Sequence, residues 1–401
     1  MAKEMYKYVI VGGGLAGISA AKGIRTIDAE GSILLIGAEK HLPYHRPPLT
    51  KSLWSKTKSI DDIFVEDFSF YGDKQVATKL GVTITQCDAQ NKTISDSSGN
   101  QVGYEKLLLA TGGIPKKLSI PGGDDPEICY YRYLDDYKRI RDLAKEGTRV
   151  VVIGGGFIGS EIAASLSQQN LAVTMVFPED YMCGRVFPES LGTTVLRKYQ
   201  ENGIRIDAGD IPTAIERKDK LFITTTKKGK RYESEIVIAG IGITPAIAIA
   251  ENAGLALENG IIVNGYFQTS NPDIYAVGDN TNFHYPALNS RRRIEHWDAA
   301  MTQGEHAGKN MAGSKEPFTY LPYFFSDLFD FGYEAVGETD PSLETVSDWQ
   351  KENQIGIIYY LKDNRVRGAM MCNVWNKLDA ARELIESHQE MTEPQLQEAI
   401  K

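Results

Sequence analysis

Two clusters of glycines have the spacing G-x-G-x-x-G, which lets a backbone turn bind the pyrophosphate of a dinucleotide. The first glycine permits a tight turn, the second lets N–H groups approach the phosphates, and the third lets a helix pack close to a strand. The partial positive charge at that helix N-terminus favours the phosphates. The glycines are Gly12, Gly14, Gly17, Gly154, Gly156 and Gly159.

The elements around each cluster would hold the turn in place. A short apolar run precedes each cluster, helical spacing follows it, and a second apolar run ends near an acid, Glu39 or Glu179. A carboxylate there accepts hydrogen bonds from ribose hydroxyls. One such cluster alone is also compatible with a glycine-rich turn that merely packs. Because the whole pattern occurs twice, about 140 residues apart, the sequence predicts two bound dinucleotides, one per copy.

Composition excludes several function classes. The chain has 401 residues, enough for two or three domains, and a net charge of −9, which gives nonspecific nucleic-acid binding little support. The basic residues around Gly229 are interpreted as a solvated hairpin tip. The four cysteines form no C-x-x-C pair and the six histidines show no metal spacing, which argues against a redox-active disulfide and a metal site. With no apparent leader or apolar span, we expect a cytoplasmic protein.

The remaining periodicity predicts an α/β chain with a mixed C-terminal part. Strands are expected at 8–11, 33–36, 82–85, 107–110, 149–153, 172–177, 235–239 and 260–263; hairpins at 91–102 and 355–372; and helices at 134–145, 161–169, 293–312 and 378–387. The region after Pro317 is rich in aromatics, and residues 115–121 are rich in Pro and Gly, a plausible domain boundary.

Several stretches resemble a known family. LLLATGG at 107–113 and IYAVGD at 274–279, with the paired glycine motifs, are similar to the two-dinucleotide-binding flavoprotein reductases. Within them, LPYHRPPLTK, IGGGFIGSEIA, FPEDYMCGRVFPESL, RRRIEHWDAAMTQGEHAGKNM and FFSDLFDFGYEAVGE most resemble apoptosis-inducing-factor-like NADH oxidoreductases. Ferredoxin and rubredoxin reductases of oxygenase systems share the architecture and are the close alternative.

The resemblance implies two Rossmann-like dinucleotide-binding domains, as in glutathione reductase, and a C-terminal α+β domain. Residues 1–125 and 255–312 would bind FAD, residues 126–254 would bind NADH, and residues 313–401 would form the third domain. The implied FAD-binding residues are Gly12, Gly14, Gly17, Glu39, Arg46, Lys51, Thr111, Gly112, Arg132, Gly278, Asp279, His296 and Trp297. Among them, His296 and Trp297 would sit close to the isoalloxazine.

The implied NADH-binding residues surround the second cluster. They are Gly156, Phe157, Ile158, Gly159, Glu179, Arg185, Gly242, Glu295, Phe325 and Glu334. Phe157 would stack on the nicotinamide, and Phe325 stands where relatives commonly have Trp, so it would still stack but without an N–H donor. Glu179 would favour NADH because a carboxylate repels a 2′-phosphate, an effect that Arg185 nearby could weaken.

Some family features are absent. Only a short connection at 340–353 stands where the animal proteins carry a long insertion, and their leader and basic nucleic-acid surface are missing. A redox-controlled release of that insertion and a nuclear death-effector role are therefore not expected.

The implied reaction is hydride transfer from nicotinamide C4 to flavin N5, for which no protein nucleophile is needed. Lys51, Glu161 and Phe157 are the predicted catalytic residues, with Lys51 and Glu161 forming an ion pair that stabilises the charge gained on reduction. The alternative for that pair is an ordinary surface salt bridge. The aromatic band at 323–333 is either core packing or a lid that stacks on NAD⁺, holds a long-lived charge-transfer complex and, as in relatives, drives dimerisation.

Three functions remain open at this point. The first is an apoptosis-inducing-factor-type FAD-dependent NADH oxidoreductase, acting as a monomer or an NADH-induced homodimer on a quinone, oxygen or a small iron–sulfur protein. The second is a ferredoxin or rubredoxin reductase. The third is an NADH-sensing interaction protein whose turnover is incidental.

Overall fold

The computed structural model describes residues 4–400, and the chain divides into two compact units. The first unit contains Met1–His45, Ile60–Ile114 and Thr244–Pro322, and the second contains Arg46–Ser59, Pro115–Ile243 and Tyr323–Lys401. The short strands β7 (Gly113–Pro115) and β15 (Ile243–Pro245) contain two of the points where the chain passes from one unit to the other.

The first unit is built on a sheet with the strand order β3-β2-β1-β6-β5-β4, and β17 also pairs with β6. These strands are β1 (Glu4–Val11), β2 (Ile33–Gly37), β3 (Val76–Leu80), β4 (Ile84–Asp88), β5 (Thr93–Asp96), β6 (Gln101–Leu109) and β17 (Ile274–Ala276). All central pairs, and that of β17 with β6, are parallel, whereas β4 and β5 are antiparallel additions. Such a sheet has both faces covered, which explains the continuous apolar runs of the sequence.

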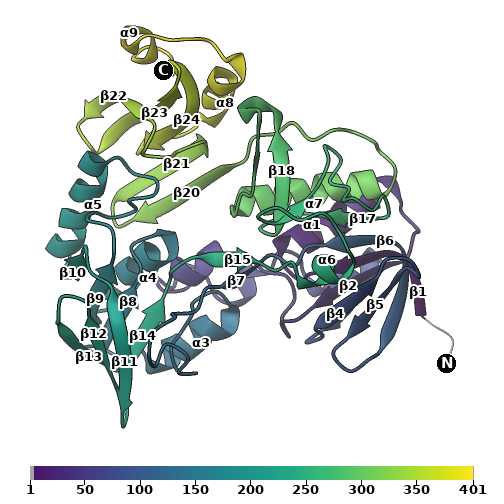
Figure 1. The fold of residues 1–401 in the computed structure, drawn as a ribbon, viewed down its shortest axis with the longest axis horizontal. Helices are drawn as coiled ribbons and strands as arrows, with labels where there is room; N and C mark the ends of the chain where they lie inside the picture. The colour runs from purple at the N-terminus through teal and green to yellow at the C-terminus, as the bar shows by residue number, and fades with distance from the viewer. Residues whose placement is uncertain (1–3, 401) are drawn as a thin grey trace. The chain divides into compact units, whose positions relative to one another are not determined.

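Two helices of the first unit approach each other closely. Helix α1 (Leu15–Ile27) packs on α7 (Trp297–Met311), and Figure 1 shows the two side by side. A Cβ at Gly23 would lie 2.1 Å from Glu305 O, and one at Gly308 would lie 2.1 Å from Ala20 O, so small residues are required at this contact. The unit also contains α2 (Phe68–Asp73), α6 (Ala248–Asn252), η2 (Asp61–Ile63), η3 (Pro286–Leu288) and the small sheet of β16 (Ile261–Ile262), β18 (Thr281–Tyr285) and β19 (Ser290–Arg292).

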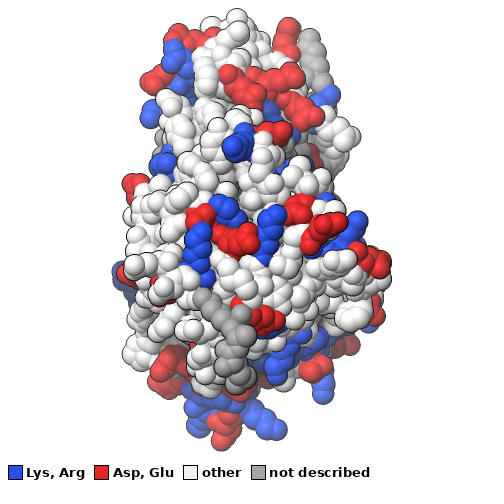
Figure 2. Space-filling view, turned by 90° about the vertical axis from the view of Figure 1, so that its right-hand side faces the viewer, with Lys and Arg blue, Asp and Glu red and all other residues white. Residues whose placement is uncertain are grey.

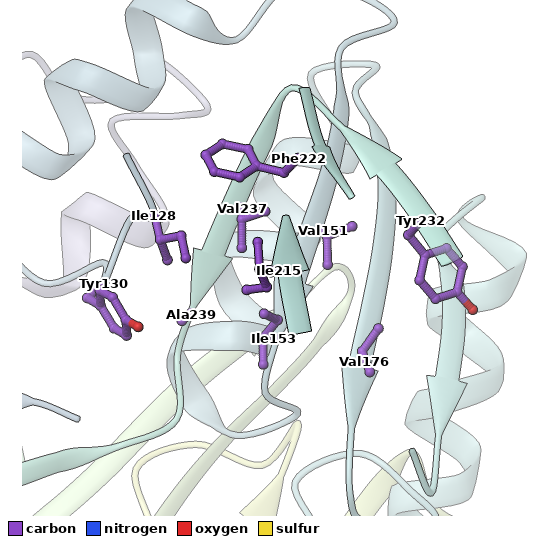
Figure 3. Packing of buried hydrophobic residues seen from close by; sticks show 10 residues of the cluster. All are labelled: Ile128, Tyr130, Val151, Ile153, Val176, Ile215, Phe222, Tyr232, Val237 and Ala239. Carbon is purple, nitrogen blue, oxygen red and sulfur yellow. The ribbon is translucent and has the colours of Figure 1, made fainter. Parts of the chain in front are cut away.

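The second unit contains another parallel sheet, with the order β10-β9-β8-β14. Its strands are β8 (Arg149–Ile153), β9 (Ala172–Phe177), β10 (Arg205–Ala208) and β14 (Ile236–Ala239), accompanied by η1 (Pro47–Thr50), α3 (Leu134–Leu143), α4 (Phe157–Ser167) and α5 (Glu189–Glu201). A three-stranded antiparallel sheet of β11 (Pro212–Lys218), β12 (Leu221–Thr226) and β13 (Arg231–Ser234) shares a core with it. Figure 3 shows Ile215 and Phe222 packed in that core with Val151 and Val237.

The C-terminal part of the second unit is a five-stranded antiparallel sheet with the order β20-β21-β24-β23-β22. It comprises β20 (Tyr323–Leu328), β21 (Phe331–Gly337), β22 (Glu344–Lys351), β23 (Ile355–Lys362) and β24 (Arg365–Cys372), followed by α8 (Leu378–Ser387) and α9 (Glu393–Leu396). Strand β22 corrects the sequence analysis, which expected only a short connection at 340–353.

Two predicted helix starts are wrong. Helix α4 begins at Phe157 rather than at 161, because the extended backbone of Gly156 (φ −84°, ψ −167°) leads directly into it. Helix α7 begins at Trp297 rather than at 293, because His296 (φ −101°, ψ 149°) is still extended.

The hairpins at 91–102 and 355–372 and the basic hairpin tip at 227–230 are confirmed. Figure 2 shows basic and acidic side chains interspersed on the face it draws, a distribution typical of a solvated surface.

Candidate functional site

The first glycine turn has the geometry of a phosphate cradle. Gly12 has φ +135°, and a Cβ there would lie 2.0 Å from Ala110 O, while a Cβ at Gly17 would lie 2.1 Å from Gly12 O. Around a Cβ at Gly14, by contrast, no atom of the described residues other than its two chain neighbours lies within 4 Å. Gly14 caps α1 without a side-chain hydrogen bond. The turn is therefore tight on its inner side and open at the helix N-terminus, which fits a pyrophosphate.

The second glycine turn repeats this geometry in the second unit. Gly154 has φ +114°, and a Cβ there would lie 2.4 Å from Gly240 O, while one at Gly159 would lie 2.0 Å from Gly154 O. Gly156 caps α4 without a side-chain hydrogen bond, and apart from its two chain neighbours no described residue has an atom within 4 Å of a Cβ placed on it. Two turns with the same tight inner side and open outer side confirm the repeat that the sequence predicted.

The acids after the two turns have different partners. In the first unit, the buried Tyr44 hydroxyl donates a hydrogen bond of 2.6 Å to Glu39 Oε2. In the second unit, Arg185 Nε lies 3.5 Å from Glu179 Oε1, and the Arg185 side chain is 80% exposed. The structure thus brings Arg185 to the acid that the sequence linked with coenzyme choice.

Other predicted residues of the first unit lie in a hydrogen-bonded group at the end of β6. Thr111 Oγ1 donates to Ala246 O (2.6 Å), and Asn280 Nδ2 donates to Thr111 Oγ1 (2.8 Å). Gly278 N, next to Asp279, donates to the buried Gln303 Oε1 (2.9 Å). Asn280 and Gln303 had no role predicted from the sequence, because each acts through a partner remote in sequence, although Gln303 lies within the family-like stretch at 291–311.

Residues 293–297 bring the remaining predicted groups of the first unit together. Trp297 Nε1 donates to His45 Nδ1 (2.9 Å), and Arg293 Nη1 donates to Asp279 O (3.0 Å). Arg293 also pairs with the predicted carboxamide ligand Glu295. Desolvation lowers the pKa of His296 to about 4, with Asp279 partly opposing the shift. The imidazole is therefore neutral at pH 7.

In the second unit, Lys51 lies in a group of charged and aromatic side chains. Lys51 Nζ lies 3.2 Å from Glu161 Oε1, 3.6 Å from Asp327 Oδ2 and 4.7 Å from the centre of the Phe325 ring. The side chains of Lys51 and Glu161 are only 17% and 9% exposed. The predicted ion pair is present and is largely buried, unlike an ordinary surface pair.

The aromatic band at 323–333 divides by strand alternation. Phe331 and Tyr333 are buried and both pack edge-on against Phe187, which fits the core interpretation for them. Tyr323 and Phe325 are partly exposed, and their rings stack with centroids 6.2 Å apart. Phe324 faces the other way, and its ring lies 5.4 Å from that of Phe157.

The remaining predicted residues also lie in the second unit. Arg46 Nη1 donates to Arg132 O (2.8 Å), and exposed Gly242 has φ +95°. Glu334 lies opposite Phe325 in the β20–β21 pair, and burial raises the pKa of Glu334. Trp375, which no motif marked, closes over Gly332, where a Cβ would lie 2.6 Å from its ring.

Comparison with known proteins defines the class. The model described as "Pyridine nucleotide-disulphide oxidoreductase" matches residues 6–304, and "Apoptosis-inducing factor, mitochondrion-associated, C-term" matches residues 307–355. The chain belongs to the pyridine nucleotide-disulphide oxidoreductases. It is thus an FAD-dependent oxidoreductase that uses a pyridine nucleotide, with two Rossmann-like domains and a C-terminal α+β domain.

Three relatives place the chain within that family. It is 33% identical to "Apoptosis-inducing factor 1, mitochondrial" of Dictyostelium discoideum, over 99% of this chain and 81% of that protein. It is 31% identical to the "Anthranilate 1,2-dioxygenase system ferredoxin--NAD(+) reductase component" of Burkholderia cepacia, over 94% and 93%. The solved covalent putidaredoxin reductase–putidaredoxin complex contains a similar chain, with TM-score 0.91, 29% identity, and coverage of 98% and 95%.

Two further findings concern the cysteines and the apolar character of the helices. All four cysteines, which lie within the described residues, are buried free thiols. Between residues 4 and 400, no helix combines the length and the apolar character needed to cross a membrane.

Proposed function

We propose that this protein is an FAD-dependent NADH oxidoreductase of the apoptosis-inducing-factor type. The observation that carries the proposal is the pair of glycine turns, each open at a helix N-terminus and each followed by an acid. FAD would bind at the first turn and NADH at the second, and the bound flavin would supply the chemistry by accepting a hydride from the nicotinamide. We keep the three domains proposed from sequence, with residues 1–125 and 255–312 binding FAD.

The chain's own residues would bind and orient the two rings. Phe157 and Phe325 would offer aromatic faces to them, and Lys51 would supply a cation where negative charge develops. Glu161 would hold that cation in place. The neutral His296 imidazole would add no second charge.

NADH preference follows from Glu179. Its carboxylate can accept a hydrogen bond from a ribose 2′-hydroxyl but repels a 2′-phosphate. Arg185, which pairs with the same carboxylate, attracts a 2′-phosphate. We expect NADH to be preferred, with the preference moderated by Arg185. Steady-state kinetics with both coenzymes measure it, and equal catalytic efficiencies would refute it.

The stacked, partly exposed pair Tyr323 and Phe325 supports the lid interpretation of the band. A lid would retain NAD⁺ against the reduced flavin as a long-lived charge-transfer complex and would slow reaction with oxygen. Anaerobic NADH titration of the purified protein tests this. The expected result is a long-wavelength absorption band that persists in air, with a shift to a dimer on size-exclusion chromatography in NADH.

A second candidate is the reduction of a small iron–sulfur protein. It is favoured by the TM-score of 0.91 to a reductase solved with putidaredoxin and by identity to a ferredoxin–NAD⁺ reductase component. Cytochrome c reduction with and without an added ferredoxin separates the candidates. A large stimulation by the carrier would favour this second function.

A further inference from the structure

The carboxylate of Glu161 joins three segments that are far apart in sequence. Thr50 Oγ1, at the end of η1, lies 2.5 Å from Glu161 Oε2. Ser326 Oγ, on β20, lies 2.5 Å from Glu161 Oε1, the oxygen that Lys51 also approaches. Thr50 and Ser326 are 3% and 1% exposed. The two hydroxyls therefore contact the carboxylate from different elements, one on each oxygen.

The two hydroxyls supply hydrogen-bond donors to the buried Glu161 carboxylate. An ionised carboxylate only accepts hydrogen bonds, and burying it is costly unless donors surround it. Ser326 Oγ and the Lys51 ammonium point at one oxygen, and Thr50 Oγ1 points at the other. Thr50 has a second acceptor, Pro47 O, but at the longer distance of 3.2 Å. The arrangement holds both oxygens of the Glu161 carboxylate.

Two carboxylates, those of Glu161 and Asp327, lie within ion-pair distance of the Lys51 ammonium. Its ammonium makes no hydrogen bond of standard geometry with the residues that the structure describes, although Glu161 lies at 3.2 Å and Asp327 at 3.6 Å. Asp327 is 59% exposed, so an ammonium paired with it would lie nearer to water. The position of the Lys51 charge consequently depends on how firmly the Glu161 carboxylate is held.

We propose that Thr50 and Ser326 are positioning residues that fix the Glu161 carboxylate, keep Lys51 beside Phe325 rather than on Asp327, and thereby raise the reduction potential of the bound flavin. The inference rests on the proposed function, because it assumes that Lys51 lies near the flavin. A cation close to the flavin stabilises the charge gained on reduction, and its displacement towards Asp327 removes part of that effect.

The test compares variants of the full-length FAD-bound protein. Thr50→Val and Ser326→Ala each remove one hydroxyl, and Thr50→Ser restores it. Ser165→Ala is the matched control, because Ser165 Oγ donates an equally short buried bond to Thr50 O, whereas the described hydrogen bonds to the Glu161 carboxylate come from Thr50 and Ser326. Spectroelectrochemistry measures the midpoint potential. We expect Thr50→Val and Ser326→Ala to lower the equilibrium constant for reduction tenfold, about 30 mV for a two-electron couple.

Two further measurements identify the cause. Adding Asp327→Asn to Ser326→Ala removes the competing carboxylate and should restore most of the lost potential. Labelling with an amine-reactive reagent, followed by mass spectrometry, should show faster modification of Lys51 in Thr50→Val than in Ser165→Ala, with or without FAD.

The outcomes separate this inference from the proposed function. A wild-type protein that holds no FAD, or whose flavin NADH does not reduce, defeats the proposed function. A wild type that is reduced normally, with the potentials and Lys51 labelling of Thr50→Val and Ser326→Ala equal to those of Ser165→Ala, overturns the inference alone. If Ser326→Ala prevents folding, the comparison of Thr50→Val with Thr50→Ser decides. If Thr50→Val prevents folding, the comparison of Ser326→Ala with Ser165→Ala decides.

Discussion

Replacing Lys51 by methionine asks whether its pair with Glu161 belongs to a cofactor site or is an ordinary ion pair. Methionine keeps the length and most of the apolar stem but removes the ammonium that lies 3.2 Å from Glu161 Oε1. The control is Lys198→Met, because Lys198 pairs with Asp330, an exposed carboxylate in the same unit. The two substitutions are chemically identical, so differences report the two environments.

The expected stability loss follows from burial. Breaking a fully buried pair by removing one partner costs about 3–5 kcal/mol, and an exposed pair contributes about 0–1 kcal/mol. Glu161 keeps the hydroxyl donors of Thr50 and Ser326 when Lys51 is lost. We therefore expect Lys51→Met to lower the free energy of unfolding by about 2 kcal/mol, and Lys198→Met by less than about 0.5 kcal/mol. Urea denaturation followed by circular dichroism measures both.

The expected effect on chemistry is larger. Removing one preorganised electrostatic group from an active site typically costs about 10²–10³ in rate, and the partial exposure of Lys51 puts our expectation near the lower end. Anaerobic stopped-flow absorbance of flavin reduction by NADH measures this directly. Equal rates for wild type and Lys51→Met, together with equal stability losses for the two lysine variants, would show that the Lys51–Glu161 pair is an ordinary ion pair with no role at the cofactor site.

Three other predictions use different parts of the molecule. Gly14→Ala should fold normally, because apart from the chain neighbours no described residue has an atom within 4 Å of the added Cβ. Its methyl should nevertheless lower the FAD content at least tenfold, measured by absorbance at 450 nm. Gly156→Ala should raise the apparent Kd for NADH at least tenfold without changing the FAD content. Arg185→Ala should increase the preference for NADH over NADPH about tenfold in kcat/KM, and an unchanged ratio would remove Arg185 from coenzyme choice. His296, whose pKa is lowered to about 4, binds its proton less readily in the folded than in the unfolded chain, so its contribution to stability is present above about pH 6.5 and is lost as the pH falls towards 4. Because His296 is only partly buried, we expect about 2 kcal/mol of pH-dependent loss, absent in His296→Gln, when urea denaturation is compared at pH 7 and pH 4.5.

The sequence predicted the parts of the fold that local physics determines. The two glycine turns were predictable because a tight bend, an open helix N-terminus and a close helix–strand contact each demand glycine at a fixed spacing. Strands β8 and β9 and helix α8 have the predicted bounds, since buried apolar runs and helical periodicity are local signals. The start of α7 was not predictable in this way, because residues 293–296 have helix-compatible composition but lie outside the helix, with Arg293 bonded to Asp279 O.

The candidate site was predictable where one motif contains the residue, and not where several segments meet. Lys51 and Glu161 were paired because both flank cofactor motifs. Thr50 and Ser326 lie within family-like stretches, but nothing in the sequence links their hydroxyls to Glu161. Asn280 and Gln303 were missed for the same reason: each is a buried amide whose partners lie on other elements. Their roles become visible only once the segments are brought together.

The two acids after the glycine turns point to different uses of the two sites. Glu39 is held by a short bond from the hydroxyl of the buried Tyr44, whereas the ion pair of Glu179 is with an 80% exposed arginine at 3.5 Å. A fixed acceptor suits a cofactor that stays bound, because its ribose finds a preorganised partner. A loosely paired acceptor suits a coenzyme that enters and leaves, because the arginine can be displaced at little cost. That asymmetry supports FAD at the first turn and NADH at the second.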